Sequence, residues 1–576
     1  MGKIFRIFNL CIAVVISTVA FGQYTNRAVL SGNSGGSPDK GIRLGKTNIA
    51  TDSVGRFSHT INLQAPSFFN FSLGGKKIEI FLSPGDSLSA DFKSKAIIFN
   101  GGGAPINNFL QEHKGLAKRN SRFLDTYNKQ VFGLEFSDFK QKMDSLKTTE
   151  ISSFDEFIEK HPKISSTFID RLKIDIDYRY RRYYLLYPLN YHRHHGYKEI
   201  ANVTLDYHDR IMQGCSDKPE LLSSANYIQC MNKYLDILSV GKYKLQNLQP
   251  ALGKRINARY DAIINLQADQ KIQDYFIGEH FNNHIWIYRV EALDYSYSKY
   301  EKDCKDTTIK KRIQNLYQIG IDRRKAAHEI TLYRKIGTIE LKAHIFYPEN
   351  FDKSNKYPAH LFFHGGSWAF GMPEWSYDAC KKAASEGRVS IAFDYRLRHL
   401  HSTGIRAPVS DVLTAIAWVR ENATNFGIDP SKILAEGFSS GGHLALTAAM
   451  IKNPKEFGVD SEFSSKPNLL ILGSTPYDVT FRDVYDIEYD PKQISPLDLV
   501  DDQLPPMLIF HGEEDTLVSF KEFQKFIEKM KTTDNEFVYR SFQNANHFYS
   551  GGSKEDPQIR EGMKKKFLAD QGYGNK

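Results

Sequence analysis

The chain has 576 residues, of which 41% are hydrophobic and 25% are charged, and its formal net charge at pH 7 is +9. The length predicts two or three domains, and the composition is typical of globular protein with sizeable cores. The positive charge is modest for this length and is spread along the chain, which favours a solvated surface over a nucleic-acid-binding face. We therefore expect no nucleic-acid partner.

The first 22 residues have the order of a secretory signal peptide. Lys3 and Arg6 precede an apolar run from Leu10 to Phe21, and a small residue, Gly22, stands where a signal peptidase would cut. The run is too short to anchor the chain in a bilayer. We therefore predict a signal peptide over residues 1–22, a periplasmic or secreted protein, and no stable membrane insertion.

Four cysteines follow the predicted signal: Cys215, Cys230, Cys304 and Cys380. None belongs to a C-x-x-C pair, so we expect no zinc site. In an oxidising compartment Cys215 and Cys230 could be bridged, but four separate thiols is the better interpretation. No other pattern in the chain asks for a metal or an organic cofactor.

A strand pattern runs through residues 23–110. Phe57, Ile61 and Leu63 mark one face of an alternating run, and residues 78–82 are a second strand candidate. Glycine-rich and Pro-Gly-Asp turns separate these runs. The pattern predicts a small β-rich domain over residues 23–110.

Residues 111–320 follow a helical pattern. Ile169, Leu172 and Ile176 recur at the spacing of one helix face, and we expect Pro162 and Pro188 to break the helical runs. The segment lacks a nucleophile motif, metal-ligand spacing and a phosphate loop. It is therefore predicted to be a helical accessory region.

One stretch of this region, residues 178–197, concentrates tyrosine, arginine and histidine. Such a basic aromatic surface could bind nucleic acid or sugar, and His192, His194 and His195 could hold a metal. A helix whose tyrosines pack and whose arginines face water is the favoured interpretation.

The N-terminal part also resembles a known family. The run from Phe81 to Leu88, Phe-Leu-Ser-Pro-Gly-Asp-Ser-Leu, and the segments Phe99–Gly101 and Asn107–Leu110 are similar to the region that precedes thioredoxin modules in periplasmic thioredoxin-like proteins. The resemblance implies an accessory β-plus-helical region over about residues 24–300. It implies no redox activity, because the C-x-x-C of a thioredoxin is missing.

Strands alternate with helices after about residue 321, which predicts a doubly wound, mostly parallel α/β sheet over residues 321–576. Eight strands are expected: Glu329–Leu332, Glu340–Phe346, Ala359–Phe363, Val389–Phe393, Ile433–Glu436, Leu469–Leu472, Met507–Phe510 and Phe537–Phe542. In such sheets, functional residues gather at the carboxyl ends of the strands.

A nucleophile motif stands at one of these ends. Residues 437–441 read G-x-S-x-G, follow the strand Ile433–Glu436 and open an apolar helix, so Ser439 is the predicted nucleophile. A serine needs a histidine base oriented by a carboxylate, and in this fold the order is serine, acid, histidine. Asp515 and His547 follow late strands in that order. Competing acids are Asp478, Glu513 and Glu514, and competing bases are His443 and His511.

A glycine pair follows the strand Ala359–Phe363. The backbone N–H groups of Gly365 and Gly366, together with that of Ser440, are predicted to form an oxyanion hole for the ester carbonyl oxygen.

These motifs together resemble the acetyl- and feruloyl-esterase side of the hormone-sensitive-lipase-like α/β hydrolases. The resemblance rests on His-Gly-Gly at 364–366, Phe-Asp-Tyr-Arg-Leu at 393–397, Gly-Ile-Asp-Pro at 427–430 and Gly-Phe-Ser-Ser-Gly-Gly at 437–442. It implies the α/β-hydrolase fold, the Ser439–Asp515–His547 triad and the oxyanion hole just described. Many members have aspartate and alanine where this chain has Phe438 and Ser440, which leaves the subfamily open.

Three functions compete for this chain. A prolyl-oligopeptidase-type serine peptidase shares the fold, the triad order and the H-G-x-x-D of residues 511–515, but usually has a β-propeller where residues 110–320 are helical. A non-catalytic binding protein would not need a complete triad. We therefore predict a carboxylic ester hydrolase, with the serine peptidase as the alternative.

The expected substrate is a small-molecule or carbohydrate ester with a short acyl group, such as acetyl or feruloyl. Trp368, Trp375 and Tyr377 are expected to be exposed near the site, and residues 473–506 contain no amphipathic lid of useful length. Because no catalytic pattern occurs upstream, a fragment starting near Asp322 is expected to keep its activity. The oligomeric state is left open.

Overall fold

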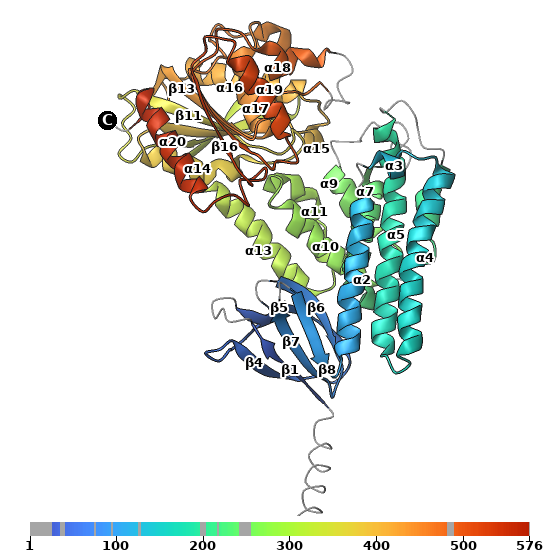
Figure 1. Ribbon diagram of the computed structural model, residues 1–576. Helices are drawn as coiled ribbons and strands as arrows, with labels where there is room; N and C mark the ends of the chain where they lie inside the picture. Colours follow the sequence, from blue (N-terminus) through green and yellow to red (C-terminus); the bar gives the residue numbers. More distant parts are fainter. Residues whose placement is uncertain are drawn as a thin grey trace, which may run out of the picture. The chain divides into compact units, whose positions relative to one another are not determined.

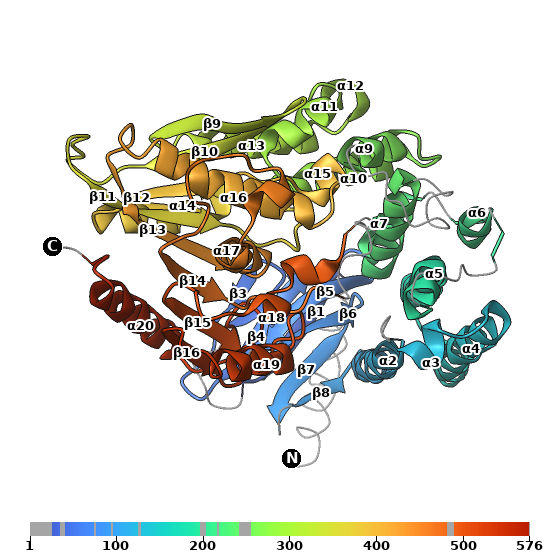
Figure 2. The same ribbon diagram turned by 90° about the horizontal axis from the view of Figure 1, so that it is seen from above.

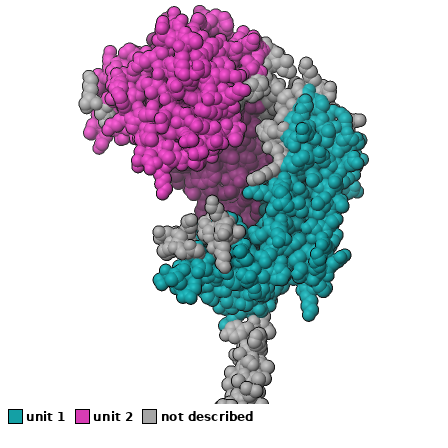
Figure 3. Space-filling model, in the orientation of Figure 1, with its two compact units in different colours: residues 1–234 teal, residues 235–576 magenta. Residues whose placement is uncertain are grey.

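The computed structural model describes residues 26–34, 41–73, 76–93, 96–124, 128–195, 203–204, 206–215, 218–240, 255–480 and 489–574. The predicted signal peptide lies outside these ranges. The chain divides into two compact units, residues 1–234 and residues 235–576 (Figure 3). The division falls inside the segment predicted as one helical region, so its last helices belong to the same unit as the eight-stranded sheet.

The first unit begins with two four-stranded sheets, of strand order β4-β1-β7-β8 and β3-β2-β5-β6. Alternate residues point inward and share one apolar core, to which Leu30 contributes from the first sheet and Ile80 from the second. The strands are β1 (Arg27–Asn33), β2 (Ile42–Leu44), β3 (Thr47–Ile49), β4 (Arg56–Asn62), β5 (Ser67–Leu73), β6 (Lys76–Leu82), β7 (Ser87–Lys93) and β8 (Ala96–Gly101).

Helices follow these sheets, and the long ones run alongside one another (Figure 1). Phe109, Phe154 and Leu172, from three different helices, pack in one aromatic-rich core with Phe81 of β6. The helices are α2 (Ala104–Phe123), α3 (Lys129–Phe132), α4 (Phe136–Lys160), α5 (Ser166–His194), α6 (Tyr207–Met212), the 3₁₀ turn η1 (Pro219–Ser223) and α7 (Ala225–Val240), within which the division between the units falls.

The prediction that a helix ends at Pro188 is wrong, because α5 continues through this residue. A proline inside a helix leaves the carbonyl four residues earlier without its usual N–H partner. Here that carbonyl belongs to Tyr184, and it accepts a hydrogen bond of 2.9 Å from the Tyr207 hydroxyl. The other expected break is confirmed, since α4 ends before Pro162 and α5 begins after it.

Of the three histidines considered as metal ligands, His195 takes part in packing. His195 lies 3.0 Å from the Gly133 carbonyl oxygen through Nε2, and its ring stacks on Tyr191. No group of three or more histidine, cysteine, aspartate or glutamate side chains in the described ranges is arranged to hold a metal ion. Cys215, Cys230, Cys304 and Cys380 are all free thiols.

The second unit contains an eight-stranded sheet of order β16-β15-β14-β13-β11-β12-β10-β9. The β9–β10 and β10–β12 pairs are antiparallel and the other five pairs are parallel. This confirms the predicted α/β fold and all eight predicted strands. They are β9 (Glu329–Ile336), β10 (Ile339–Phe346), β11 (Tyr357–Phe363), β12 (Val389–Phe393), β13 (Ile428–Phe438), β14 (Leu469–Gly473), β15 (Met507–Gly512) and β16 (Phe537–Phe542).

Helices cover both faces of this sheet (Figure 2). On β11, Leu361 packs in the core that holds α16 (Arg406–Glu421), α17 (Ser440–Met450) and α19 (Phe520–Met530). The next residue, Phe362, packs on the other face against α14 (Tyr377–Ser385), while α20 (Asp556–Asp570) covers the β14–β15 part of that face. Shorter elements are η3 (Pro373–Ser376), α15 (Arg398–His401), η4 (Pro454–Phe457), η5 (Pro491–Ile494) and α18 (Pro496–Leu499).

Among the described residues, six helical elements that lie wholly in this unit precede the sheet. Asp322, expected to start a separable hydrolase fragment, lies inside the last of them, so a cut there would remove most of one helix. No helix in the described ranges has the length and apolar character needed to cross a membrane. The six elements are α9 (Arg255–Ile264), α10 (Gln270–His284), η2 (Val290–Leu293), α11 (Asp294–Tyr297), α12 (Tyr300–Asp303) and α13 (Thr307–Arg324).

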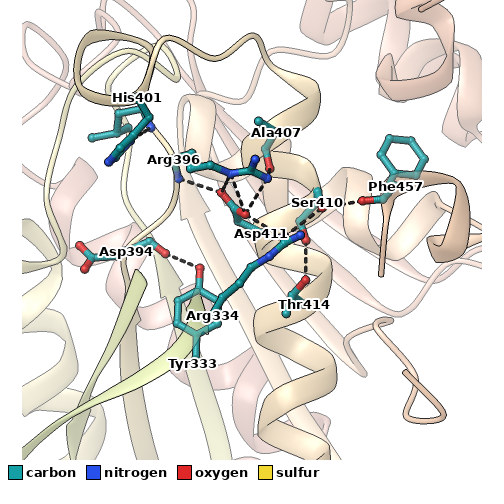
Figure 4. Close-up of polar contacts among 11 residues, drawn as sticks. Tyr333, Arg334, Asp394, Arg396, His401, Ala407, Ser410, Asp411, Thr414 and Phe457 are labelled. Atoms are coloured by element: carbon teal, nitrogen blue, oxygen red, sulfur yellow. Dashed lines mark hydrogen bonds and ion pairs between the residues drawn. The ribbon is translucent and has the colours of Figure 1, made fainter. Parts of the chain in front are cut away.

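A buried carboxylate fixes the segment after β12 to the rest of the unit (Figure 4). Asp411 of α16 is fully buried and accepts hydrogen bonds from Arg334 of β9 at 2.7 Å and from the Arg396 guanidinium at 2.9 Å. The backbone N–H of Arg396 donates to the same carboxylate at 2.8 Å. The Asp-Tyr-Arg segment, residues 394–396, is therefore held in place by charge as well as by packing.

We predict that Asp411→Ala lowers the free energy of unfolding by about 3–5 kcal/mol, because it leaves two largely buried guanidinium groups without their carboxylate. Urea denaturation followed by tryptophan fluorescence measures this change. The control is Asp460→Ala, whose side chain is 92% exposed and pairs with Lys455 at 3.4 Å. Such an exposed pair contributes about 1 kcal/mol or less, so equal losses in the two variants would contradict the prediction.

Candidate active site

Ser439 occupies a strained turn between β13 and α17. Its backbone has φ 54° and ψ −125°, a conformation that L-residues rarely adopt. The turn is held on both sides, since the Ser439 N–H donates to the Gly473 carbonyl at 2.8 Å and the His443 N–H donates to the Ser439 carbonyl at 3.1 Å. This is the strand–turn–helix geometry that the G-x-S-x-G spacing predicts.

The start of α17 lies directly against the end of β11. A Cβ atom at Gly441 would come within 1.9 Å of the Phe363 carbonyl oxygen, so a side chain cannot fit there. The second glycine of the motif thus permits a close approach between the Ser439 turn and the strand that leads to Gly365 and Gly366.

Asp515 and His547 are joined by a hydrogen bond of 2.7 Å between Oδ2 and Nδ1. The backbone N–H groups of Leu517 and Val518 donate to the other carboxylate oxygen at 2.8 Å each. Burial raises the pKa of Asp515, but the hydrogen bonds from His547 and these N–H groups outweigh it and lower the pKa below its usual value. The carboxylate therefore stays ionised beside the imidazole.

His547 is placed next to the Ser439 turn. The Ser474 hydroxyl donates to the His547 carbonyl at 2.9 Å, and Ser474 directly follows the glycine that accepts the Ser439 N–H. The imidazole also contacts the ring of Phe438, with 5.1 Å between centroids. With Nδ1 bonded to Asp515, His547 presents Nε2 as the base.

The competing acids have other contacts. Asp478 accepts from the N–H and the hydroxyl of Thr480 within its own loop, at 3.0 and 2.6 Å. Glu513 accepts from the Ser541 hydroxyl at 2.7 Å, and Glu514 is exposed. These contacts favour Asp515 as the acid.

The competing bases are both fully buried in structural contacts. His443 lies 2.8 Å from the Ile494 carbonyl through Nε2 and accepts from the Trp368 indole N–H at 3.3 Å. His511 lies 3.1 Å from the Val518 carbonyl and 3.6 Å from Asp515 Oδ2. His511 thus packs behind the acid, and His547 is favoured as the base.

The predicted oxyanion loop also lies beside Ser439. A Cβ atom built on Gly365 would be 3.4 Å from the Ser439 Cβ. Gly366 has φ 118°, and its carbonyl accepts the N–H groups of Ala369 and Phe370 at 2.9 and 3.1 Å. Ser440 is the first residue of α17, where backbone N–H groups have no acceptor within the helix.

Tyr395 supports this loop, a role that the sequence pattern did not predict. Its hydroxyl donates to the His364 carbonyl at 2.6 Å, and its ring stacks on the His364 imidazole with centroids 4.3 Å apart. Burial lowers the pKa of His364 to about 4, so this histidine is neutral. The position of Tyr395 directly after Asp394 in the Asp-Tyr-Arg segment was the only signal for it.

The prediction that three aromatic side chains are exposed near the site is wrong for two of them. Trp368 and Tyr377 are each only 5% exposed, because Trp368 packs against His443 and the Tyr377 hydroxyl lies 2.6 Å from His344 Nδ1. Trp375 is exposed as expected. Phe548, next to the candidate base, is 66% exposed and was missed because single aromatics in loops carry no periodic signal.

Comparisons with known proteins relate part of this chain to esterases. Residues 344–471 match the BD-FAE family model. Esterase LipC of Mycobacterium tuberculosis is 29% identical over 215 residues, which cover 33% of this chain and 52% of LipC. Carboxylesterase NlhH of the same organism is 33% identical over 96 residues, covering 16% of this chain and 29% of NlhH.

Among solved structures, the apo form of esterase 2 from Thermogutta terrifontis is 32% identical. The match covers 44% of this chain and 97% of that one, with a TM-score of 0.41. The chain spans about half the length of LipC and of LipQ, a second M. tuberculosis esterase. The predicted resemblance to α/β-hydrolase esterases is confirmed, and these relatives do not favour the peptidase alternative.

We predict that Asp515→Asn lowers kcat for a short ester by up to about 10⁴-fold, because the imidazole loses the carboxylate that orients it and stabilises its cation. Steady-state kinetics with p-nitrophenyl acetate measures the effect. Asp478→Asn serves as the matched control and is expected to stay close to wild type. The opposite ranking would move the acid to the loop after β14.

Proposed function

We propose that the second unit is a carboxylic ester hydrolase that works through an acyl-enzyme on Ser439. The observation that carries the proposal is the buried 2.7 Å pair of Asp515 and His547 beside the strained turn of Ser439. A strained nucleophile, a base and an orienting acid at one edge of an α/β sheet support nucleophilic acyl transfer.

The reaction proceeds in two halves. Ser439 Oγ attacks the ester carbonyl carbon while His547 Nε2 takes the hydroxyl proton, and Asp515 stabilises the resulting imidazolium. The negative oxygen of the tetrahedral intermediate is held by backbone N–H groups of Gly365, Gly366 and Ser440. Collapse breaks the C–O bond, and the leaving alcohol takes the proton from His547.

Water completes the cycle. His547, neutral again, removes a proton from a water molecule that attacks the acyl carbonyl carbon, and the same N–H groups hold the second oxyanion. Breaking the bond to Ser439 Oγ releases the carboxylic acid and returns the proton to the serine. No other reactant is required.

We infer that the acyl group is short and that the ester is a small molecule or is linked to a carbohydrate, as an acetyl or feruloyl group. Between β14 and β15, the described residues contain only the short elements η5 and α18, of four residues each. These are too short to cover a long acyl chain with one amphipathic face.

We also propose that residues 1–22 are a cleaved signal peptide and that the protein acts in the periplasm or outside the cell. Support comes from the charged, apolar and small-residue order of this segment. N-terminal sequencing of the protein recovered from the periplasm or medium tests this, and a retained Met1 would contradict it.

Ser439→Ala is expected to lower ester hydrolysis by about 10⁴-fold or more while the protein stays folded, because no other group can form the acyl-enzyme. Labelling with a fluorophosphonate probe and hydrolysis of p-nitrophenyl acetate are measured together, with circular dichroism to verify folding. Wild-type protein that neither labels nor hydrolyses esters would contradict the proposed function. Faster cleavage of a dipeptide amide than of any ester would favour the peptidase.

We expect acetyl esters to give a higher kcat/KM than esters with acyl chains of about eight carbons. Each methylene gains about 0.8 kcal/mol only when it is buried, and a short-acyl site offers no surface to bury a long chain. A series of p-nitrophenyl esters from two to twelve carbons measures this. A steady rise of kcat/KM with chain length would instead indicate a lipase.

A further inference from the structure

The segment Trp286–Glu291 follows α10 and includes the first two residues of η2, and it lies upstream of the part of the chain that matches the BD-FAE model. It belongs to the same compact unit as the sheet and makes hydrogen bonds and an ion pair with two loops of the hydrolase fold. One loop, residues 364–376, carries the predicted oxyanion hole. The other, residues 394–400, follows β12.

Two contacts reach the first loop through backbone carbonyls. The Gly371 N–H donates to the Ile287 carbonyl at 2.9 Å, and the Trp375 indole N–H donates to the Trp286 carbonyl at 2.7 Å. Gly371 in turn packs closely against Gly365, because a Cβ atom built on Gly371 would lie 2.7 Å from the Gly365 carbonyl oxygen. The segment thus supports the turn that brings the loop back to Gly365.

Two further contacts reach the second loop through side chains. Arg289 Nη1 lies 2.8 Å from Asp394 Oδ2, and the Tyr288 hydroxyl lies 2.8 Å from His399 Nδ1. The His399 N–H donates to the Ala369 carbonyl at 3.0 Å, so the second loop is in turn bonded to the first.

Asp394 links Arg289 to the loop that carries the predicted oxyanion hole. Its side chain is 3% exposed, and the residue after it is Tyr395, whose hydroxyl holds the His364 carbonyl. Burial raises the pKa of Asp394, but Arg289 and neighbouring cationic groups outweigh it and lower the pKa. A buried carboxylate that loses its cation is costly, so the end of β12 would shift without Arg289.

We propose that the segment Trp286–Glu291 positions the oxyanion hole, with Arg289 as its main positioning residue. Two of the four contacts end at Gly371 and Trp375, in the loop that carries Gly365 and Gly366. The other two end at Asp394, the neighbour of Tyr395, and at His399, which donates to the Ala369 carbonyl of that loop. Oxyanion donors act only when they are held about 2.7–3.1 Å from the developing charge, so displacement of the loop should slow acylation. The proposal rests on the esterase function proposed above.

The test uses the full chain with Arg289→Met, which removes the charge but keeps an unbranched side chain, and Arg289→Lys, which restores a cation. Active sites are counted by stoichiometric labelling with a fluorophosphonate, so that misfolded protein does not lower the measured rate. The readouts per active site are kcat/KM for p-nitrophenyl acetate and the inhibition constant of a short trifluoromethyl ketone. This ketone adds to the serine and places an alkoxide in the oxyanion hole.

We expect Arg289→Met to lower kcat/KM and to weaken ketone inhibition by similar factors, about 10- to 100-fold, as for a misplacement of about 1 Å. Arg289→Lys should recover part of both losses. The control is Arg312→Met on α13, because Arg312 also forms an ion pair with a carboxylate, that of Glu279 on α10, at 3.6 Å, although this pair is more exposed than that of Arg289. Both readouts of the control should stay within about twofold of wild type, since Arg312 pairs outside the two loops.

Trp375→Phe keeps the test decisive if Arg289→Met does not fold. It removes one N–H donor to the Trp286 carbonyl, and we expect both readouts to fall by about 3- to 10-fold, the effect of one hydrogen bond. Variants that lose thermal stability but keep wild-type kcat/KM and ketone inhibition per active site would overturn the positioning role. A wild type that neither hydrolyses esters nor labels would instead overturn the proposed function and this inference with it.

Discussion

A carboxylate buried away from water needs a cation or several N–H donors, and this need shapes the segment after β12. Asp394 is bound by Arg289, whereas Asp411 binds Arg396 and Arg334. Tyr395 lies in the chain between Asp394 and Arg396, both of which are held by ion pairs. Its hydroxyl therefore has little freedom to move away from the His364 carbonyl. The predicted oxyanion loop is consequently held by charges that take no part in the proposed chemistry.

The candidate nucleophile depends on similar support. Ser439 has a backbone conformation that costs free energy, and such strain persists only when the surroundings determine it. The carbonyl of Gly473 and the N–H of His443 fix the turn from two sides, and the close approach at Gly441 presses it against β11. The geometry of the candidate nucleophile is thus set by the sheet and α17 rather than by the serine alone.

This arrangement changes how the domains of the chain are understood. The sequence pattern placed a boundary near residue 320, where helices give way to strands. In the structure the helices from α9 to α13 share one compact unit with the sheet, and Arg324 of α13 joins Glu374 in the oxyanion loop at 3.2 Å. A change of secondary-structure type is therefore a poor guide to a domain boundary where ion pairs cross it.

The sequence by itself determined the eight strands of the sheet, the serine turn and the order of the candidate triad residues. These follow from local patterns, because apolar periodicity and G-x-S-x-G spacing are set by neighbouring residues. It also predicted Asp515 and His547 from their places after strands, since parallel strands bring their carboxyl ends to one edge.

Only the tertiary structure decided which carboxylate meets the histidine, why α5 passes through Pro188, and which aromatics are buried. Each depends on a partner far away in the sequence: His547 for Asp515, Tyr207 for the Tyr184 carbonyl, and His443 for Trp368. The role of Arg289 is of the same kind, because its partner Asp394 lies 105 residues later. Local periodicity carries no information about such pairs, and the packing of the folded unit creates them.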